Sequence, residues 1–253
     1  MILLRRLHSL YALLIFVFTF IVLFPVFLIA SFHPRLHFIA YKVDHWWAKV
    51  YFPLTLFRTE VVFKGARPDK GPVIYCLNHF SYLDIPSTGL LPKQACFVGK
   101  ASIKKVPLFG YMFRTLHIAV DRESIKDRVR AYKKYTLAIE QGKSLFIYPE
   151  GGIRSKNIPT QASYKDGAFR VAIEQQVPII PVTLPFNWKI LPDGIWTLQS
   201  NYIKLVVHEP IHTKGMTLEN LTDLKERVYH VIQNQIEVEN DLMVTNDELV
   251  SAT

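Results

Sequence analysis

An uncharged apolar run near the start of the chain, residues 10–32, limits what this protein can fold into more than any other feature. It is interrupted only by one threonine, one proline and one serine, and it is long enough to cross a bilayer. A cleaved signal peptide is the alternative, because Arg5 and Arg6 precede the run as a basic segment would. However, the run exceeds the roughly 7–15 apolar residues of such peptides and lacks a clear cleavage site, so the sequence predicts a retained membrane segment.

A second apolar segment follows at residues 37–57, but three charged residues interrupt it, so it is too polar to span a membrane. Its aromatic side chains are of the kind that lies at headgroup depth, namely Tyr41, Trp46, Trp47 and Tyr51. We therefore expect this segment to lie in the membrane interface. The alternative is a core helix of the domain that follows, since aromatic residues are often simply buried.

The remainder of the chain alternates short apolar runs with helical patterns, which is typical of an α/β domain. Strands are predicted at 59–64, 72–77, 95–98, 117–120, 144–148, 178–184 and 203–208. Helices are predicted near 84–91, 107–115, 123–141, 163–175 and 217–239. The expected fold is one mixed, largely parallel sheet of about seven strands flanked by helices, at residues 58–236. A membrane-associated helical hairpin at 1–57 precedes it, and an acidic flexible tail at 237–253 follows.

The composition and net charge of the chain limit the classes of molecule that it is expected to bind. Half of the residues are apolar and 20% are charged, which excludes a disordered chain, and the formal net charge of +9 suits an anionic partner such as a phospholipid or a phosphorylated metabolite. No nucleic-acid-binding motif is present, so nucleic acid is not expected. Cys76 and Cys96 form neither a CxxC pair nor a metal-ligand cluster, so we expect no metal site and a reducing compartment.

The first segment whose side chains could take part in catalysis is Asn78 to Asp84, directly after a predicted strand. His79 and Asp84 are five residues apart, so they can meet only if His79 lies in the turn and Asp84 in the first turn of a following helix. Asp84 could then hold the imidazole of His79 and leave its Nε2 as a general base. The alternative is an ordinary helix cap with a histidine in the loop.

A second segment, residues 148–155, follows another predicted strand and contains two glycines and an arginine. Gly151 allows close backbone approach and Arg154 offers a bidentate fork, so an anion could bind here, although a tight turn with a solvated arginine fits equally well. A third segment, residues 93–134, has eleven bases and three acids, including Lys100 and Arg122. The alternative interpretation of this segment is a basic surface that is simply exposed to solvent.

Taken together, these segments resemble the glycerolipid acyltransferase family, of the lysophosphatidate (1-acylglycerol-3-phosphate) acyltransferase type, over roughly residues 60–210. NHFSYLD matches the family's NHxSxxD (HX4D) block, GKASIKKVPLFGYMFRTLHIAVDR its second block, YPEGGIRS its FPEGTRS block and VPIIPV its fourth. The resemblance implies His79 and Asp84 as catalytic residues, with substrate-binding roles for Lys100, Arg122, Glu150, Gly151 and Arg154. One departure is that Gly152 and Ile153 separate Gly151 from the arginine.

The resemblance implies a membrane-bound enzyme that moves an acyl group from acyl-CoA or acyl-carrier protein to lysophosphatidate and needs no cofactor. Its expected partners are the lyso-lipid, the acyl donor and an anionic membrane surface. Another lyso-lipid acceptor, such as a lyso-amino-lipid or a lysophospholipid, is the alternative within the same chemistry. A non-catalytic lipid-binding or transfer protein is the alternative of another class.

Two features of the sequence favour different membrane topologies. Arg5 and Arg6 favour a cytoplasmic N-terminus, and a single span would then place the domain outside the cytosol, away from the acyl donors. Bends at Pro25 and at His33–Pro34 would instead return the chain to the same side. We therefore expect a monotopic hairpin in the cell inner membrane, with the active site facing the cytoplasm.

Overall fold

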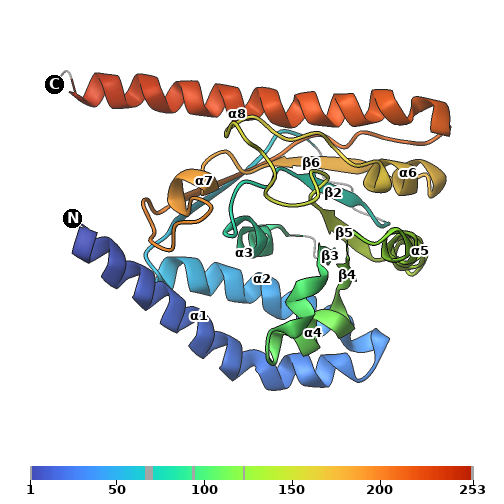
Figure 1. Ribbon diagram of the computed structural model, residues 1–253, viewed down its shortest axis with the longest axis horizontal. Coiled ribbons are helices and arrows are strands. Elements are labelled where there is room, and N and C mark those ends of the chain that lie inside the picture. Colours follow the sequence, from blue (N-terminus) through green and yellow to red (C-terminus); the bar gives the residue numbers. More distant parts are fainter. Residues whose placement is uncertain (1, 66–70, 93–94, 122, 252–253) are drawn as a thin grey trace.

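The computed structural model describes residues 2–65, 71–92, 95–121 and 123–251, and Figure 1 shows their arrangement. The strands are β1 (Arg58–Phe63), β2 (Ile74–Leu77), β3 (Ala95–Lys100), β4 (Ile118–Val120), β5 (Ser144–Ile147), β6 (Ile179–Thr183) and β7 (Tyr202–Val207). The α-helices are α1 (Ile2–Ser31), α2 (His37–Leu54), α3 (Asp84–Ser87), α4 (Phe109–Leu116), α5 (Ile125–Glu140), α6 (Gly167–Glu174), α7 (Asn187–Ile190) and α8 (Leu221–Ser251). Short 3₁₀ helices are η1 (Pro34–Leu36), η2 (Thr88–Leu90), η3 (Ala101–Lys105) and η4 (Leu218–Asn220).

The strands form one seven-stranded sheet in the order β1-β7-β6-β2-β5-β3-β4. All neighbouring strands are parallel except β6 and β7, which are antiparallel. The central strand β2 pairs with β5 on one side and with β6 on the other. The prediction of a mixed, largely parallel sheet of about seven strands is therefore confirmed.

Alternate residues of the central strands face opposite helical layers. Ile74 and Cys76 of β2 lie in a core cluster with side chains of α5, α6 and α8, which cover one face of the sheet. Tyr75 and Leu77 lie in a second cluster with side chains of α1 and α2, which cover the other face. The four β2 side chains are all buried, as expected for a strand with helices on both faces.

Helices α1 and α2 form the predicted hairpin (Figure 1). Helix α1 continues through Pro25, and the chain reverses direction after Ser31, where His33 accepts the N–H of Arg35 at the start of η1. Helix α1 is long and apolar enough to cross a membrane, by length and composition. Ala12 of α1 and Phe52 of α2 are buried in the same cluster as the sheet, so the hairpin is one of its two helical layers.

The aromatic side chains of α2 differ in their exposure. Trp46 is exposed, but Trp47 donates its indole N–H to Thr19 on α1 at 2.8 Å. The buried hydroxyls of Tyr41 and Tyr51 donate to backbone carbonyls of α4 and α1. Trp47 and Tyr51 therefore join the two helices of the hairpin, and Tyr41 joins α2 to α4, as the alternative of a core helix would have it.

The end of the chain also differs from the prediction. Residues beyond 237 were expected to form a frayed acidic tail, but helix α8 continues through Ser251 along one face of the molecule (Figure 1). Glu239 is buried, and its carboxylate accepts hydrogen bonds from Lys204 of β7 at 3.1 Å and from Gln235 at 2.9 Å. Pairing with a lysine of the sheet neutralises this acid and allows the helix to continue past residue 237.

Candidate active site

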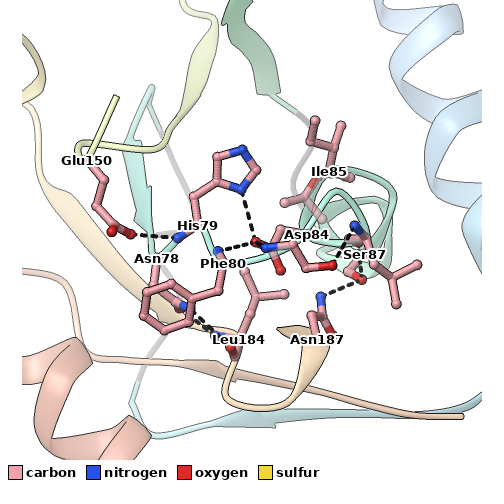
Figure 2. Close-up of polar contacts among 12 residues, drawn as sticks. Asn78, His79, Phe80, Asp84, Ile85, Ser87, Glu150, Leu184 and Asn187 are labelled. Carbon is pink, nitrogen blue, oxygen red and sulfur yellow. Dashed lines mark hydrogen bonds and ion pairs between the residues drawn. The ribbon is translucent and has the colours of Figure 1, made fainter. Parts of the chain in front are cut away.

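The loop between β2 and α3 brings His79 and Asp84 together, as Figure 2 shows. The Oδ2 atom of Asp84 lies 3.0 Å from Nδ1 of His79 and also accepts the backbone N–H groups of Phe80 and Ser81, at 2.8 and 2.9 Å. Because Oδ2 acts as an acceptor, Nδ1 is the protonated nitrogen and Nε2 carries the free lone pair. Among the described residues, Nε2 has no hydrogen-bond partner.

Tyr148, directly after β5, supports the other side of the imidazole. Its ring stacks on that of His79 with a centroid distance of 4.3 Å and an interplanar angle of 27°. Burial, followed by the neighbouring carboxylate of Asp84, raises the pKa of Tyr148 well above its ordinary value, so the phenol stays neutral. The imidazole is therefore fixed by a hydrogen bond to one nitrogen and by an aromatic ring against its face.

Glu150 forms hydrogen bonds with the backbone of two loops. It is fully buried, and one carboxylate oxygen accepts the backbone N–H of His79 at 2.7 Å (Figure 2). The other oxygen accepts the backbone N–H of Ala162 at 2.8 Å. Burial raises its pKa to about 7, against the two hydrogen bonds, which favour the ionised form. Both carboxylate oxygens thus have partners within the chain, and Glu150 connects the backbone of His79 to the loop before α6.

Gly151 begins the predicted anion-binding loop. Its φ of +82° is a conformation that favours glycine, and a Cβ at this position would lie 3.9 Å from Nε of Arg154 and 3.7 Å from Cγ of Lys165. Arg154 thus folds back towards Gly151 despite the intervening Gly152 and Ile153. Lys165 is an exposed cation at the same loop that the sequence analysis did not single out.

Arg154 also connects the loops of the second and third sequence blocks. Its Nη2 lies 3.6 Å from a carboxylate oxygen of Glu123, and both side chains are largely exposed, so the pair adds little stability. Glu123 is the neighbour of Arg122, which itself lies outside the described residues. Lys100 is exposed at the end of β3, in register with Val120 of β4.

The topology explains why these residues share one region. His79 follows β2, Glu150 and Gly151 follow β5, and Lys100 ends β3. The three strands are parallel neighbours in the order β2-β5-β3, so their carboxyl ends meet at one edge of the sheet. Ligands of open α/β sheets bind in the crevice at this edge.

Three polar side chains whose structural roles the sequence analysis missed hold the His79 loop and α3 in place, and Figure 2 shows two of them, Asn78 and Asn187. The side-chain amide of Asn78 donates to the carbonyl of Leu184 and accepts its N–H, at 3.0 and 2.8 Å. Ser81 donates to the carbonyl of Leu191, and Asn187 of α7 donates to Ser87 of α3. Asn78 could have been found, because an amide directly after a buried strand can continue the strand's hydrogen bonding.

Residues 58–185 match the family model described as Acyltransferase. The chain belongs to the acyltransferase family. The resemblance predicted from the four sequence blocks is therefore confirmed, and the His79 loop and the Gly151 loop both lie within the matched residues.

Individual acyltransferases show how far the similarity extends. A chloroplastic 1-acyl-sn-glycerol-3-phosphate acyltransferase of Arabidopsis thaliana is 33% identical over 143 residues, which are 56% of this chain and 40% of that protein. A 1-acyl-sn-glycerol-3-phosphate acyltransferase of Haemophilus influenzae is 26% identical over 198 residues, 77% of this chain and 80% of that protein. The chain spans about half the length of the plant and algal relatives that it matches.

A solved structure extends the similarity of the fold beyond the matched family model. The crystal structure of the 1-acyl-sn-glycerophosphate acyltransferase PlsC from Thermotoga maritima superposes with a TM-score of 0.71 and 23% sequence identity. The superposition covers 93% of this chain and 98% of that one. The two chains therefore share a fold over nearly their whole lengths.

An apolar cavity of about 120 Å³, partly open to the outside, lies between the acyltransferase domain and its hairpin. Its walls come from α1, α2, the α3–η2 segment, β3 and α4, and include Ile85, the residue after Asp84. Two polar side chains, Asp44 and His117, interrupt the apolar lining. Burial raises the pKa of Asp44 to about 7 and lowers that of His117 to about 3, so His117 is neutral and Asp44 is partly protonated near neutral pH.

The backbone amides at the start of α3, which lie close to His79 and could be considered as oxyanion donors, already have partners. Those of Asp84 and Ile85 donate to the carbonyls of Ser81 and Tyr82, at 3.2 and 3.4 Å. The amide of Leu83 donates to the Ser81 hydroxyl. These groups are therefore not free to bind an oxyanion in this structure.

The cysteines are poorly suited to act as nucleophiles. Cys76 and Cys96 are buried, and burial raises the pKa of both thiols, to about 12 for Cys96. The described residues contain no cluster of three or more histidine, cysteine or acidic side chains that could hold a metal ion. His79 is thus the group in this region that is best placed to accept a proton.

Proposed function

We propose that this protein transfers an acyl group from acyl-CoA or acyl-carrier protein to the free hydroxyl of lysophosphatidate, giving phosphatidate at a membrane surface. The observation that carries the proposal is the contact of 3.0 Å between Nδ1 of His79 and Oδ2 of Asp84, which leaves Nε2 able to accept a proton. The proposal is also supported by membership of the acyltransferase family and by relatives named 1-acyl-sn-glycerol-3-phosphate acyltransferase.

In the proposed reaction, Nε2 of His79 removes the proton of the acceptor hydroxyl as its oxygen attacks the thioester carbonyl. Asp84 stabilises the imidazolium that forms, because its Oδ2 accepts the Nδ1–H. The tetrahedral intermediate then collapses and breaks the carbon–sulfur bond. The departing thiolate takes the proton from His79, so the histidine returns to its starting state without an acyl-enzyme intermediate.

The acceptor's phosphate is proposed to bind near the Gly151 loop. Arg154 and Lys165 contribute positive charge beside Gly151, whose missing side chain lets a ligand approach the backbone. Lys100 ends the strand next to β5, and Arg122 is proposed from its place in the second sequence block to complete the site. An ester phosphate with two negative charges suits such a group of cations better than a neutral headgroup does.

The acyl chain of a lipid substrate is proposed to enter the cavity between the hairpin and the sheet. The cavity reaches Ile85, next to Asp84, so a chain lying in it would have its carbonyl end near the proposed base. Because α1 and α2 form part of the cavity wall, a lyso-lipid could enter from the bilayer without passing through water. The proposal places the hairpin in the inner membrane and the His79 loop on the cytoplasmic side, where the acyl donors are found.

An acyl-transfer assay with the full-length protein in mixed micelles tests the proposal. Labelled acyl-CoA and acyl-carrier protein are each supplied with lysophosphatidate, a lysophospholipid or a lyso-amino-lipid. We expect labelled phosphatidate from lysophosphatidate, and a fall in kcat of about 10² to 10⁴ for His79→Ala. His212→Ala, at an exposed loop position, is the matched control and should keep full activity.

The proposed acceptor and the proposed catalytic base can be rejected independently of each other. Turnover of another lyso-lipid in place of lysophosphatidate would reject the acceptor but keep the reaction type. Wild-type activity in folded His79→Ala would reject the proposed base. Stoichiometric lipid binding without turnover of any acceptor would instead support a lipid-binding or transfer protein.

A further inference from the structure

The loop between α7 and β7 exposes two large apolar side chains. Trp196 is 86% exposed and Ile195 is 46% exposed. An indole ring with so little burial contributes almost nothing to the stability of the domain, and tryptophan is normally well buried. A partner outside the described chain is therefore expected to cover this loop.

Hydrogen bonds fix this loop to the beginning of α1. The N–H of Leu198 donates to the hydroxyl of Ser9 at 2.8 Å, and the guanidinium of Arg5 donates to the side-chain carbonyl of Gln199 at 2.7 Å. The buried side chain of Leu198 also lies in the core cluster that contains Ala12 of α1. The exposed Trp196 is thus held two residues away from an attachment point on the membrane hairpin.

The C-terminal end of α2 contacts the same loop, and two leucine side chains are exposed there. The side-chain amide of Asn201 donates to the carbonyl of Leu56 at 3.0 Å. Leu54 is 46% exposed and Leu56 is 65% exposed. Leu56 has a φ of +65° and closes the C-terminus of α2, where the N–H groups of Leu56 and Phe57 donate to the carbonyls of Pro53 and Phe52 at 3.0 and 2.8 Å.

We propose that Leu54, Leu56, Ile195 and Trp196 form a second membrane contact, which extends the lipid-facing surface of the hairpin onto the catalytic domain. These four residues are called the loop contact. Its occupant is the interfacial region of the bilayer in which α1 is proposed to lie. The inference rests on the membrane association in the proposed function, but not on the identity of the acceptor.

Three observations favour a bilayer over a protein partner. The loop contact continues an exposed apolar surface of α1, where Leu3, Leu7 and Leu10 are each more than half exposed. Arg5 and Arg6 lie at the same end of α1 and suit anionic headgroups. Tryptophan prefers headgroup depth, where the ring faces hydrocarbon and the indole N–H stays hydrated.

The loop contact would also fix the active site relative to the bilayer. The loop that carries Trp196 begins after Leu191, whose carbonyl accepts the hydroxyl of Ser81 in the His79 loop at 2.7 Å. At its other end the loop is bonded to Ser9 of α1. A single segment therefore connects the His79 loop to the membrane helix, and a second lipid contact there would prevent the domain from turning about the axis of α1.

The test uses full-length protein in vesicles of phosphatidylcholine and anionic phosphatidylglycerol. Ile195→Cys is labelled with an environment-sensitive fluorophore, because both native cysteines are buried. Leu218→Cys is the matched control, since Leu218 is 43% exposed in η4, which packs with α6 and α8 on the face of the sheet opposite the hairpin. Leu14→Cys on α1, which is 58% exposed, reports the hairpin itself. Quenching by spin-labelled lipid is the measurement.

We expect strong quenching at positions 14 and 195 and at least a threefold weaker effect at position 218. Quenching at position 14 with none at position 195 would overturn the loop contact and leave the membrane hairpin intact. Absence of quenching at both positions would overturn the loop contact and also the proposed membrane association of the hairpin. Acyl transfer in detergent micelles is measured on the same samples, so a failure of the proposed reaction is distinguished from a failure of the membrane contact.

Discussion

The carboxylate of Glu150 accepts the backbone N–H of His79 at 2.7 Å, and its other oxygen accepts the N–H of Ala162. The glutamate of the third sequence block therefore acts on the first block, through the backbone of the proposed base. Asp84 orients the imidazole ring and Glu150 fixes the backbone that carries it. Both carboxylates are fully buried, so neither is available as an exposed contact for the acceptor.

Glu150→Gln tests this arrangement. A glutamine can offer only one acceptor oxygen, so one of the two backbone N–H groups would lose its partner inside the core, at a cost of about 1–3 kcal/mol. We expect a lower midpoint of thermal unfolding and a reduced kcat, because the backbone of His79 is released. Glu226→Gln on the exposed face of α8 should change neither quantity. An unchanged midpoint for Glu150→Gln would contradict the buried bridge.

Asp84→Asn should act on the chemical step. The amide keeps an acceptor oxygen for Nδ1–H but lacks the charge that stabilises the imidazolium. We expect kcat to fall by roughly 10² to 10⁴ with little change in the acceptor KM. Steady-state kinetics on a variant with a normal circular dichroism spectrum provide the measurement. A large rise in KM alone would instead place Asp84 in substrate binding.

Arg154→Ala should weaken binding of a phosphorylated acceptor. Loss of one charge-assisted hydrogen bond corresponds to about tenfold in KM, and Arg122→Ala should behave in the same way. Arg170→Ala, at an exposed position of α6, is the matched control. If Arg154→Ala has the KM of the wild type, Arg154 does not contact the phosphate, and its role is limited to the ion pair with Glu123.

Asp44→Asn should remove a pH dependence of stability. Burial raises the pKa of Asp44 from its ordinary value of 3.8 to about 7, so the folded state prefers the protonated acid. Between about pH 4 and pH 7 the unfolded chain ionises first, and the wild type loses stability as the pH rises. The unfolding midpoint of Asp44→Asn should therefore match the wild type near pH 4 and exceed it increasingly up to pH 7. Asp193→Asn at an exposed position should show no such trend.

Cysteine labelling tests the monotopic topology. Single cysteines are introduced as Leu3→Cys, at the start of α1, and Thr160→Cys, at an exposed position of the domain. A membrane-impermeant reagent should label both on the same side of sealed vesicles, whereas opposite sides would require a true span. The buried Cys76 and Cys96 should remain unlabelled in the native protein.

The strand pattern and the His79–Asp84 pair could be predicted because each depends on local sequence. Short apolar runs bounded by turn residues give strands, and all seven lie where the sequence predicts them. The spacing of His79 and Asp84 requires a turn followed by a helix start, which is what the structure contains. Both inferences need only a few neighbouring residues.

The parts that could not be predicted depend on residues far apart in the chain. The roles of Glu150 and Tyr148 follow from pairing β2 with β5, and no local pattern gives that pairing. The buried position of Tyr51 depends on α1 packing against α2. Glu239 is ordered because Lys204 lies beneath α8, a contact between residues 35 positions apart.

The position of β1 has a consequence for how the chain is made. This strand directly follows the hairpin, lies at one edge of the sheet and pairs only with β7 in the described sheet. A ribosome adding about 5 to 20 residues per second would complete β7 many seconds after β1 has emerged. During that interval α1 and α2 have no finished sheet to cover. The nascent hairpin therefore meets the bilayer before it meets its own domain, and folding of the enzyme is expected to finish on the membrane.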